Sequence, residues 1–577
     1  MKDLKKNLKL SWKYAKGQKS KIIGFVICNI VHIIISVVVP IISAQVIVKL
    51  TENELMQVIY MAVVLFLIEI LRNLIHFLSR YFSQVTYRET FTNVQLDLGK
   101  SILKLKNSCI DSNSSGVFIQ RLTTDTAKIA DVFNILNFQL TEVLTNIGIF
   151  VAIFIIDVRI FIYMLLMILI IGLLEVRRVS LLNQKDKAFR KENERVSGFV
   201  GELVRGVRDI KMLSAEKSFI KEMHSRLINL NDKKYQMNKV QRNYMFLIGG
   251  LRDLFDLTII CLLVYLIYVG DITIAVALVV HNYMSRVTYV VNSYSFLLEG
   301  LKDFNLSSNR IFEIINSSNF PKEKFGTRKL DNIKGNFEFK NVKFKYEDSS
   351  EIFNNLSFKV NSHSTVAFVG KSGAGKTTIF NLLCKMYDIE DGEIKIDGVN
   401  IKELNKDSIR DNITIISQNP YIFNVSIKDN LKLVKDDLTE EEMIEACRAA
   451  CLDEFIDALP DRYDTIVGEG GISLSGGQRQ RLAIARALVQ KTRIILFDEA
   501  TSALDNITQT RIQQAIDNLQ GEYTILIIAH RLSTIINSDR ILFLDDGEIK
   551  AEGTHEELLK TCKEYKKLYD SEIEKQV

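Results

Sequence analysis

One stretch of the sequence has the residue types and the spacing needed to hold phosphate groups. It reads Gly370-Lys371-Ser372-Gly373-Ala374-Gly375-Lys376-Thr377-Thr378, and its first eight residues match the pattern GxxxxGK[ST]. Glycines let backbone N–H groups approach phosphate oxygens, the lysine brings a positive charge to the β and γ phosphates, and the hydroxyl of Thr377 can ligate Mg²⁺. A β-like run, Thr365–Val369, precedes the stretch and a helix-like run, Thr378–Met386, follows it. This context predicts a nucleotide-binding phosphate loop.

An acidic pair lies some 120 residues further on, after a buried-strand pattern. The apolar run Ile494–Phe497 ends in Asp498 and Glu499. Asp498 is suited to hold Mg²⁺ through water, and Glu499 is suited to polarise an attacking water molecule. An apolar run followed by two acids is a weak signal alone. After a phosphate loop it predicts the catalytic side of an ATP hydrolase.

A second glycine-rich motif, Leu474-Ser475-Gly476-Gly477-Gln478, stands between these two elements. A helix-like run, Arg479–Leu488, follows it directly. The glycine pair could be an ordinary turn. Because free N–H groups at a helix start form an anion site, we interpret the motif as a second phosphate-binding surface.

The elements that position these motifs belong to the second of two different halves. Long apolar runs extend from about residue 22 to residue 298, whereas the chain beyond about residue 302 alternates charge, glycine and short apolar runs. The 577 residues, 47% of them hydrophobic, average these halves. We predict a six-helix, all-α transmembrane domain followed by an α/β P-loop domain. The expected boundaries are a basic arm (1–21), a transmembrane domain (22–302), a linker (303–334) and a nucleotide-binding domain (335–577).

Six apolar segments have about the length that a bilayer requires. They are Ile22–Val48, Leu55–Leu78, Phe133–Ile156, Val158–Val176, Phe246–Val269 and Ile274–Leu298. The two long connections, 79–132 and 177–245, are rich in Arg and Lys, and the start of the chain carries eight lysines up to Lys21. Basic loops remain in the cytoplasm, so we expect the N-terminus and the nucleotide-binding domain to be cytoplasmic. Both long connections are helix-patterned and could project well beyond the membrane.

Several polar residues fall within the predicted spans. Ionisable groups in a membrane are costly and usually face a cavity or one another. Glu69 lies near the middle of its span and is the best candidate for a substrate-pathway residue; the others are His32, His76, Glu142, Asp253, Asp256, His281 and Arg286.

Charge and cysteine usage exclude some other functions. A formal net charge of +5 is weak, and an apolar segment directly follows the basic arm, so we expect no nucleic-acid partner. The seven cysteines are scattered without a CxxC pair, and Cys447 and Cys451, four apart on a predicted helix, have no second ligand pair nearby. We interpret them as ordinary helix residues.

The phosphate loop, LSGGQ and ILFDEATSALD, in this order, resemble the nucleotide-binding domain of the ABC transporter superfamily. The first half resembles the exporter-type (type IV) transmembrane domain, whose two intracellular-loop stretches look like 113–125 (NSSGVFIQRLTTD) and 206–216 (GVRDIKMLSAE). The resemblance covers nearly the whole chain.

This resemblance implies roles for further residues. Tyr346 would stack on adenine, Gln418 would reach Mg²⁺ and the attacking water, and 465–471 (TIVGEGG) would be the loop that touches the intracellular loops. Ser475 and Gly477 would contact the γ-phosphate held by an opposing subunit, Asp505 would lie between the paired domains, and His530 would hold the γ-phosphate.

The implied activity is ATP hydrolysis coupled to transport, with export of a hydrophobic drug, lipid or peptide as the leading function. One chain carries one copy of each motif, so it must pair with itself or with a related chain. Import on the same fold and an ATP-gated channel or regulator remain as alternative functions, whereas the six spans argue against a soluble ATPase.

About 21 residues precede the first span, so we expect no leader peptidase domain. Four prolines and high Lys, Asn and Ile usage hint at a bacterial chain.

Overall fold

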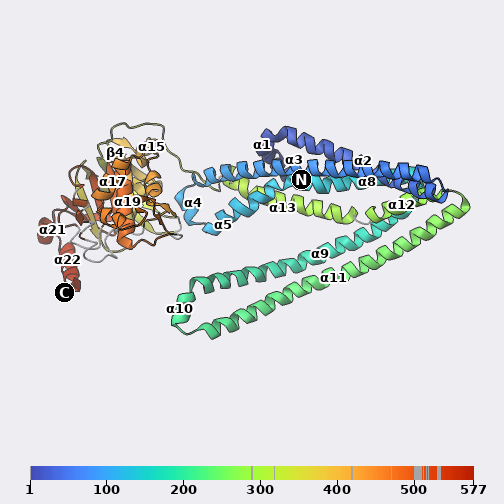
Figure 1. Cartoon of the computed structure of the whole chain (residues 1–577). Helices are drawn as coiled ribbons and strands as arrows, with labels where there is room; N and C mark the ends of the chain where they lie inside the picture. Colours follow the sequence, from blue (N-terminus) through green and yellow to red (C-terminus); the bar gives the residue numbers. More distant parts are fainter. Residues whose placement is uncertain are drawn as a thin grey trace. The chain divides into compact units, whose positions relative to one another are not determined.

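The computed structural model describes residues 2–287, 290–316, 319–347, 349–417, 420–468, 471–498, 510, 513–514, 516–517, 519–528 and 535–576. The chain divides into two compact units (Figure 1). Met1–Leu103 and Gly116–Asn319 form the helical unit, and Lys104–Ser115 and Phe320–Val577 form the α/β unit. The domain boundaries expected from the sequence stay predictions.

The helical unit consists of long helices joined by short turns. The elements are α1 (Lys2–Ala15), η1 (Lys16–Gln18), α2 (Lys19–Thr51), α3 (Leu55–Ile102), α5 (Ser115–Gln120), η2 (Arg121–Asp125), α6 (Thr126–Ala130), α7 (Val132–Ile135), η3 (Leu136–Leu140), α8 (Thr141–Ile156), α9 (Val158–Arg205), α10 (Val207–Met212), α11 (Glu216–Val269), α12 (Ile274–Val287) and α13 (Val290–Asn316). The segments η2 and η3 are π-helical, and η1 is a 3-10 turn.

The turns explain why the long helices fold back on each other. Asp157 caps α9, accepting hydrogen bonds from the backbone N–H groups of Arg159 (2.7 Å) and Ile160 (3.2 Å). Gly270 ends α11 at φ +84°, a conformation that costs glycine little. The long basic connections of the sequence are therefore mostly continuations of the helices, as the α9–α10–α11 hairpin shows (Figure 1).

Four described helical stretches are long and apolar enough to cross a membrane, and a shorter apolar helix covers Ile274–Met284. The four stretches are Asp3–Thr51, Leu55–Ile102, Ser115–Ile156 and Val158–Arg205. Their outer faces expose large apolar side chains, for example Phe66 (63% exposed) and Leu169 (60%). Such surfaces suit hydrocarbon and not water. The count of six spans stays a prediction.

The α/β unit is built on a six-stranded sheet with the order β12-β11-β3-β10-β9-β6, a four-stranded antiparallel sheet with the order β2-β1-β4-β5, and a β7-β8 pair. In the six-stranded sheet, only β12 runs antiparallel to its neighbour. The strands are β1 (Phe337–Lys345), β2 (Glu351–Val360), β3 (Thr365–Gly370), β4 (Asp391–Ile396), β5 (Val399–Asn400), β6 (Ile413–Ile416), β7 (Val425–Ser426), β8 (Ile466–Val467), β9 (Ile494–Asp498), β10 (Thr524–Ile528), β11 (Arg540–Asp545) and β12 (Glu548–Gly553).

Both faces of the six-stranded sheet are buried, which explains the continuous apolar runs of its central strands. Ile495 and Phe497 of β9 join one core cluster, and Ile494 and Leu496 join the other. The helices of this unit are α4 (Asn107–Asp111), α14 (Lys376–Leu383), α15 (Lys406–Arg410), α16 (Ile427–Lys432), α17 (Glu440–Ala449), α18 (Asp453–Asp457), η4 (Arg462–Asp464), α19 (Gly476–Gln490), α21 (His555–Thr561) and α22 (Lys563–Gln576).

The two helices predicted beside the glycine motifs differ from the expectation at their ends. We predicted a helix-like run to Met386, but α14 ends at Leu383 because Lys385 takes a left-handed conformation (φ +51°). In contrast, α19 runs two residues past Leu488 and ends where Lys491 takes φ +56°. Side-chain patterns cannot reveal such backbone reversals at lysines.

Candidate nucleotide site

The parallel strands bring the predicted motifs to one edge of the sheet. Strand β10 pairs with both β3 and β9, so that Ile528 lies opposite Phe368 on one side and Asp498 on the other. The carboxyl ends of these strands therefore meet, and in open α/β sheets ligands bind at this edge. The phosphate loop leaves the end of β3, and Asp498 is the last residue of β9.

The glycines of the phosphate loop lie where a side chain would collide. A Cβ at Gly375 would come within 2.6 Å of the Phe353 ring, and its φ of +96° is strained for other residues. A Cβ at Gly370 would lie 2.0 Å from the carbonyl oxygen of Leu544. The loop can follow this path only with glycine at these two positions.

Lys376 is held inside the loop. It is the first residue of α14 and is 6% exposed. Its Nζ donates hydrogen bonds to the carbonyl oxygens of Gly370 (2.9 Å) and Lys371 (2.8 Å). A cation buried against the loop backbone attracts phosphate more strongly than a solvated one would. Lys371, by comparison, has a side chain that is 75% exposed and lies 3.4 Å from Asp545.

Thr377 and Asp498 meet although 121 positions separate them. The Thr377 hydroxyl donates a hydrogen bond of 3.1 Å to the Asp498 carboxylate, which is 9% exposed. The two side chains place hydroxyl and carboxylate oxygens side by side, next to the start of α14. This oxygen donor set suits a small, hard divalent cation.

Tyr346 lies beside the phosphate-loop helix, within an aromatic group. Its hydroxyl is 3.3 Å from the Thr378 hydroxyl and accepts a hydrogen bond of 3.4 Å from Asn381, both on α14. Its ring meets the ring of Tyr387 edge-to-face at 4.9 Å. The half-buried Tyr346 therefore links the end of β1 to α14, the helix that follows the phosphate loop.

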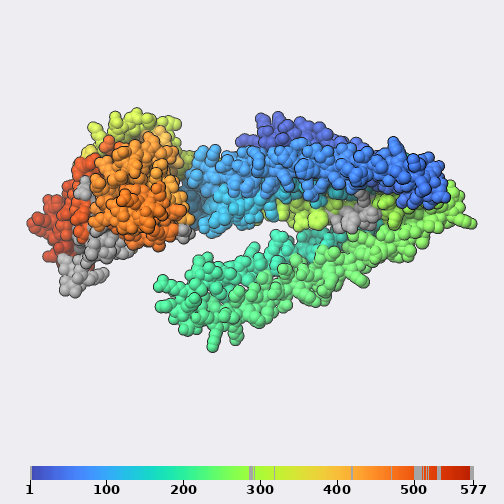
Figure 2. Space-filling model, viewed as in Figure 1, coloured from blue at the N-terminus to red at the C-terminus, as the bar shows by residue number. Residues whose placement is uncertain are grey.

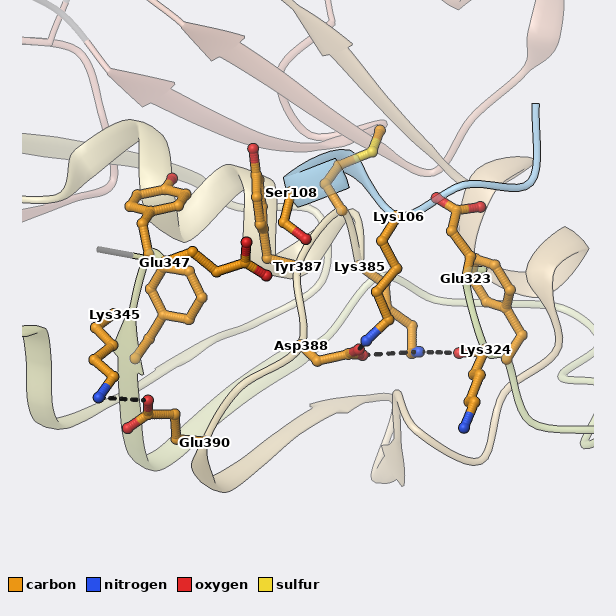
Figure 3. Close-up of a pocket in the computed structure, with 14 residues that line it drawn as sticks. Lys106, Ser108, Glu323, Lys324, Lys345, Glu347, Lys385, Tyr387, Asp388 and Glu390 are labelled. Atoms are coloured by element: carbon orange, nitrogen blue, oxygen red, sulfur yellow. Dashed lines mark hydrogen bonds and ion pairs between the residues drawn. The ribbon is translucent and has the colours of Figure 1, made fainter. Parts of the chain in front are cut away.

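A cavity of about 190 Å³ adjoins Tyr346 and Tyr387, and Figure 3 shows charged side chains around it. Lys106, which directly precedes α4, points toward Asp388 and forms an ion pair with it at 2.7 Å (Figure 3). Burial alone would raise the pKa of Asp388, but Lys106 and Lys385 together outweigh burial and lower that pKa below its ordinary value. The cavity is thus closed on one side by a segment that comes from the first long connection of the helical half.

We define this segment, Lys104–Ser115 with α4, as the docked segment. Its backbone pairs with the stretch that begins the second part of the α/β unit, with bonds from the Lys106 N–H to the Pro321 carbonyl (2.9 Å) and from the Glu323 N–H to the Lys104 carbonyl (2.8 Å). Two of its apolar side chains, Leu105 and Cys109, are buried. The docked segment is an integral part of the α/β unit.

The hydroxyl of Tyr387 donates a hydrogen bond to the Asp111 carboxylate of the docked segment. Burial, together with this bond, raises the pKa of the Tyr387 phenol above its ordinary value. Sequence reasoning missed Lys106, Asp111 and Tyr387. No spacing rule joins positions more than 270 residues apart, and the predicted stretch 113–125 began two residues beyond Asp111.

The LSGGQ motif forms the start of α19 through a capping box. The Ser475 hydroxyl accepts the Gln478 N–H (3.3 Å), and the Gln478 side-chain oxygen accepts the Ser475 N–H (2.7 Å). Gly476 and Gly477 are the first two helical residues, and Gly477 is buried. The predicted second anion site therefore lies at the N-terminus of a 15-residue helix, where N–H groups and the helix dipole favour negative charge.

Several predicted residues lie outside the described ranges. They are Gln418, Glu499, Asp505 and His530, together with two residues of the predicted 465–471 loop. The site residues assigned from the sequence stay predictions, including those whose positions are given above.

In the helical unit, Glu69 forms an ion pair with Arg72 of the same helix. The clearest polar cluster lies elsewhere: Asn29 donates to Asn137 (2.7 Å), and the Ser79 hydroxyl donates to Asn137 (2.7 Å). Asn137 belongs to the π-helical η3, where the wider turn presents a buried amide between α2 and α3. The role of Glu69 in a substrate pathway stays a prediction.

Comparison with known proteins agrees with this architecture. A family model described as the ABC transporter transmembrane region matches residues 22–290, and one described as ABC transporter matches residues 353–502.

Similar proteins span nearly the same length. An ATP-dependent lipid A-core flippase of Haemophilus influenzae (strain 86-028NP) is 34% identical over 519 residues, covering 87% of this chain and 86% of that protein. The protein YgaD of Bacillus subtilis (strain 168), whose name provisionally refers to multidrug export and to an ATP-binding/permease protein, is 31% identical over 516 residues and covers 88% of each chain.

The fused arrangement and the nucleotide motifs together define an ATPase coupled to transmembrane transport. The chain binds ATP through its α/β unit and is a membrane protein through its helical unit. It belongs to the ABC transporter family, as an exporter-type half-transporter in which one transmembrane region is fused to one ATP-binding domain.

Proposed function

We propose that this chain is one half of an ATP-driven exporter and works as a pair with a second half-transporter, identical or related. The carrying observation is that one chain holds one phosphate loop and one LSGGQ helix start. In the family that it resembles, each nucleotide is bound between the phosphate loop of one domain and the LSGGQ of the other. A single chain supplies half of each of two such sites.

The residues at the sheet edge fit magnesium nucleotide. Thr377 and Asp498, 3.1 Å apart, would hold Mg²⁺, while Lys376 would hold the β and γ phosphates. A bound Mg²⁺ would neutralise phosphate charge during hydrolysis. Glu499 directly follows Asp498 in the chain, and we assign it the polarisation of the attacking water; His530 and Gln418 keep the roles implied by the resemblance.

ATP would act as the link between the paired domains. With LSGGQ of the opposing chain on its γ-phosphate, closure is favoured before hydrolysis and disfavoured after it. The docked segment supports this coupling, because a piece of the first long connection is held by the α/β unit through Lys106 and Asp111. Movement of the α/β unit would then displace the helices on either side of that piece.

The proposed cargo is hydrophobic or amphipathic: a lipid, a drug or a small peptide. Two similar proteins carry names that refer to lipid A and to multidrug export. The helical unit also offers both polar and apolar contacts to such a cargo. A cavity of about 280 Å³ is lined by Arg80, Gln84, Asn134 and Phe138, and the Arg80 guanidinium lies 5.3 Å from the Phe138 ring centroid. We place the nucleotide-binding domain and the N-terminus in the cytoplasm of a bacterial cell.

The test is ATPase activity of the purified chain in nanodiscs, with candidate lipids and drugs added in turn. We expect cargo to stimulate ATPase activity, and Glu499→Gln to lower activity to near background while ATP binding persists. Normal turnover in that variant would refute the assigned role of Glu499. Uptake into inside-out but not right-side-out vesicles would support export, and the reverse result would establish import.

A further inference from the structure

The N-terminal helix α1 carries its positive charge on one side only. At 100° per residue, Lys5, Lys6, Lys9, Trp12 and Lys13 of α1 fall within an arc of about 120°. These five side chains are exposed, and so is that of Lys16, which follows in η1. The opposite side contains Asn7, Ser11 and Ala15, which are 2%, 1% and 0% exposed. The helix therefore has a buried side made of small and polar residues and a basic outer side with one large aromatic ring.

The buried side fixes α1 against two long helices. The Asn7 amide donates to the side-chain oxygens of Asn305 (2.8 Å) and Asn309 (2.7 Å) on α13. At the other end of α1, the Tyr14 hydroxyl donates to Asp97 of α3 at 2.5 Å, and its ring stacks on Phe312 of α13. These contacts hold α1 in one rotational setting, so that its basic side must point outward.

No described acidic residue neutralises this outer side. Lys5, Lys6, Lys9, Lys13 and Lys16 form no ion pair with any residue that the structure describes. Figure 2 shows the N-terminal part of the chain, in dark blue, on the outside of the helical unit. Four exposed lysines on one face of α1, with a fifth at the start of η1, require a partner of opposite charge, either small counterions or a negatively charged surface.

The position of α1 in the chain indicates which surface this is. Only the short η1 turn separates α1 from α2, whose apolar run begins at Ile22, six residues after Lys16. Basic residues this close to a spanning segment lie near the headgroups of the cytoplasmic leaflet, and each lysine near an anionic leaflet strengthens binding about fivefold. Trp12, 45% exposed among the lysines, has the ring type that prefers the membrane–water interface.

We propose that the outer side of α1, defined by Lys5, Lys6, Lys9, Trp12 and Lys13 together with the adjoining Lys16 of η1, is a docking surface for anionic phospholipid headgroups. It binds the cytoplasmic leaflet by charge and by the indole ring of Trp12, and through Asn7 and Tyr14 it holds α3 and α13 to the membrane surface. This role is independent of the cargo and of the direction of transport.

Trp12 is the only tryptophan in the chain, so its fluorescence reports on α1 alone. We would reconstitute the full chain into nanodiscs containing 30% phosphatidylglycerol and 70% phosphatidylcholine, with brominated chains on one lipid or the other. Because bromine quenches at short range, the proposal predicts that a brominated anionic lipid quenches Trp12 more than twice as strongly, per mole, as a brominated neutral lipid.

The variant Lys5→Gln/Lys6→Gln/Lys9→Gln is expected to abolish that preference, and the matching Lys→Arg triple variant is expected to keep it. The three positions are exposed, so the fold should tolerate both changes. The control is Lys233→Gln/Lys234→Gln/Lys239→Gln, which removes the same charge from exposed positions of α11 and should leave the preference intact.

Equal quenching by both lipids would overturn the proposal, and so would quenching by aqueous iodide alone. A change in Trp12 fluorescence on adding an oligonucleotide, with no lipid preference, would assign the basic side to nucleic acid and would also overturn it.

Discussion

The α/β unit and the helical unit distribute their functional groups in different ways. In the α/β unit, three neighbouring parallel strands end at one edge, and Lys376, Thr377 and Asp498 lie there within a few residues of a strand end. In the helical unit, polar side chains such as Asn29, Ser79 and Asn137 lie on three different elements, α2, α3 and the short η3, and share hydrogen bonds. We therefore expect a single substitution at the sheet edge of the α/β unit to abolish most of the ATPase activity. A single substitution in the polar cluster of the helical unit should cause only a modest loss of stability.

The largest expected effect is at Lys376. The variant Lys376→Ala removes a buried cation from the phosphate loop and should reduce ATPase activity by about 100-fold or more. The measurement is steady-state ATPase activity together with nucleotide binding. Lys371→Ala is the matched control, because this neighbouring lysine is 75% exposed at its side chain, and its activity should stay within about threefold of the parent chain. Similar losses in both variants would contradict the special position of Lys376.

Thr377→Val should have the next largest effect. It keeps the shape of the side chain but removes the hydroxyl that meets Asp498, so we expect about a 30-fold loss of ATPase activity and a higher Mg²⁺ requirement. A Mg²⁺ titration of ATPase activity checks this. Thr377→Ser retains the hydroxyl and should behave nearly as the parent chain. If Val and Ser substitutions gave the same Mg²⁺ dependence, the hydroxyl would have no part in metal binding.

Tyr387→Phe tests the docked segment. Losing the hydrogen bond to Asp111 should lower the local opening free energy of residues 104–115 by about 1.5 kcal/mol. Hydrogen exchange of that peptide is the measurement, and faster exchange there with unchanged exchange in β9 is the expected result. Tyr421→Phe, at an exposed tyrosine of the same unit, is the control. Unchanged protection of 104–115 in Tyr387→Phe would show that this bond does not hold the segment.

Asn137→Ala should have the smallest effect, which completes the comparison. It breaks bonds to Asn29 and Ser79, but polar groups in a helical bundle find other partners, so we expect a loss of about 1 kcal/mol in stability. Thermal unfolding in detergent would show a modest fall in Tm. Asn282→Ala, at an exposed amide of α12, should leave Tm unchanged. If Asn137→Ala also reduced ATPase activity by about 100-fold, as we expect for Lys376→Ala, the two units would not differ in their sensitivity to single substitutions.

Much of the α/β unit could be predicted from the sequence because its motifs are local. The glycines, the buried strand before Asp498 and the capped start of α19 each follow from a few neighbouring residues. The assembly around Tyr387 could not be predicted, since Asp111, Lys106 and Asp388 come together only through the fold. In the helical unit the apolar runs indicated long helices, but the π-helical turn that buries Asn137 has no signature in residue spacing.

Because of the docked segment, the boundary between the two units is not a single position in the sequence. The backbone passes from one unit to the other at three points, after Leu103, Ser115 and Asn319, instead of along a single tether. A fragment that begins at Phe320 would therefore lack the docked segment. The apolar surface of the α/β unit that Leu105 and Cys109 cover in the intact chain would then be exposed to water. Within the intact chain, a force on either unit is therefore distributed over three covalent connections.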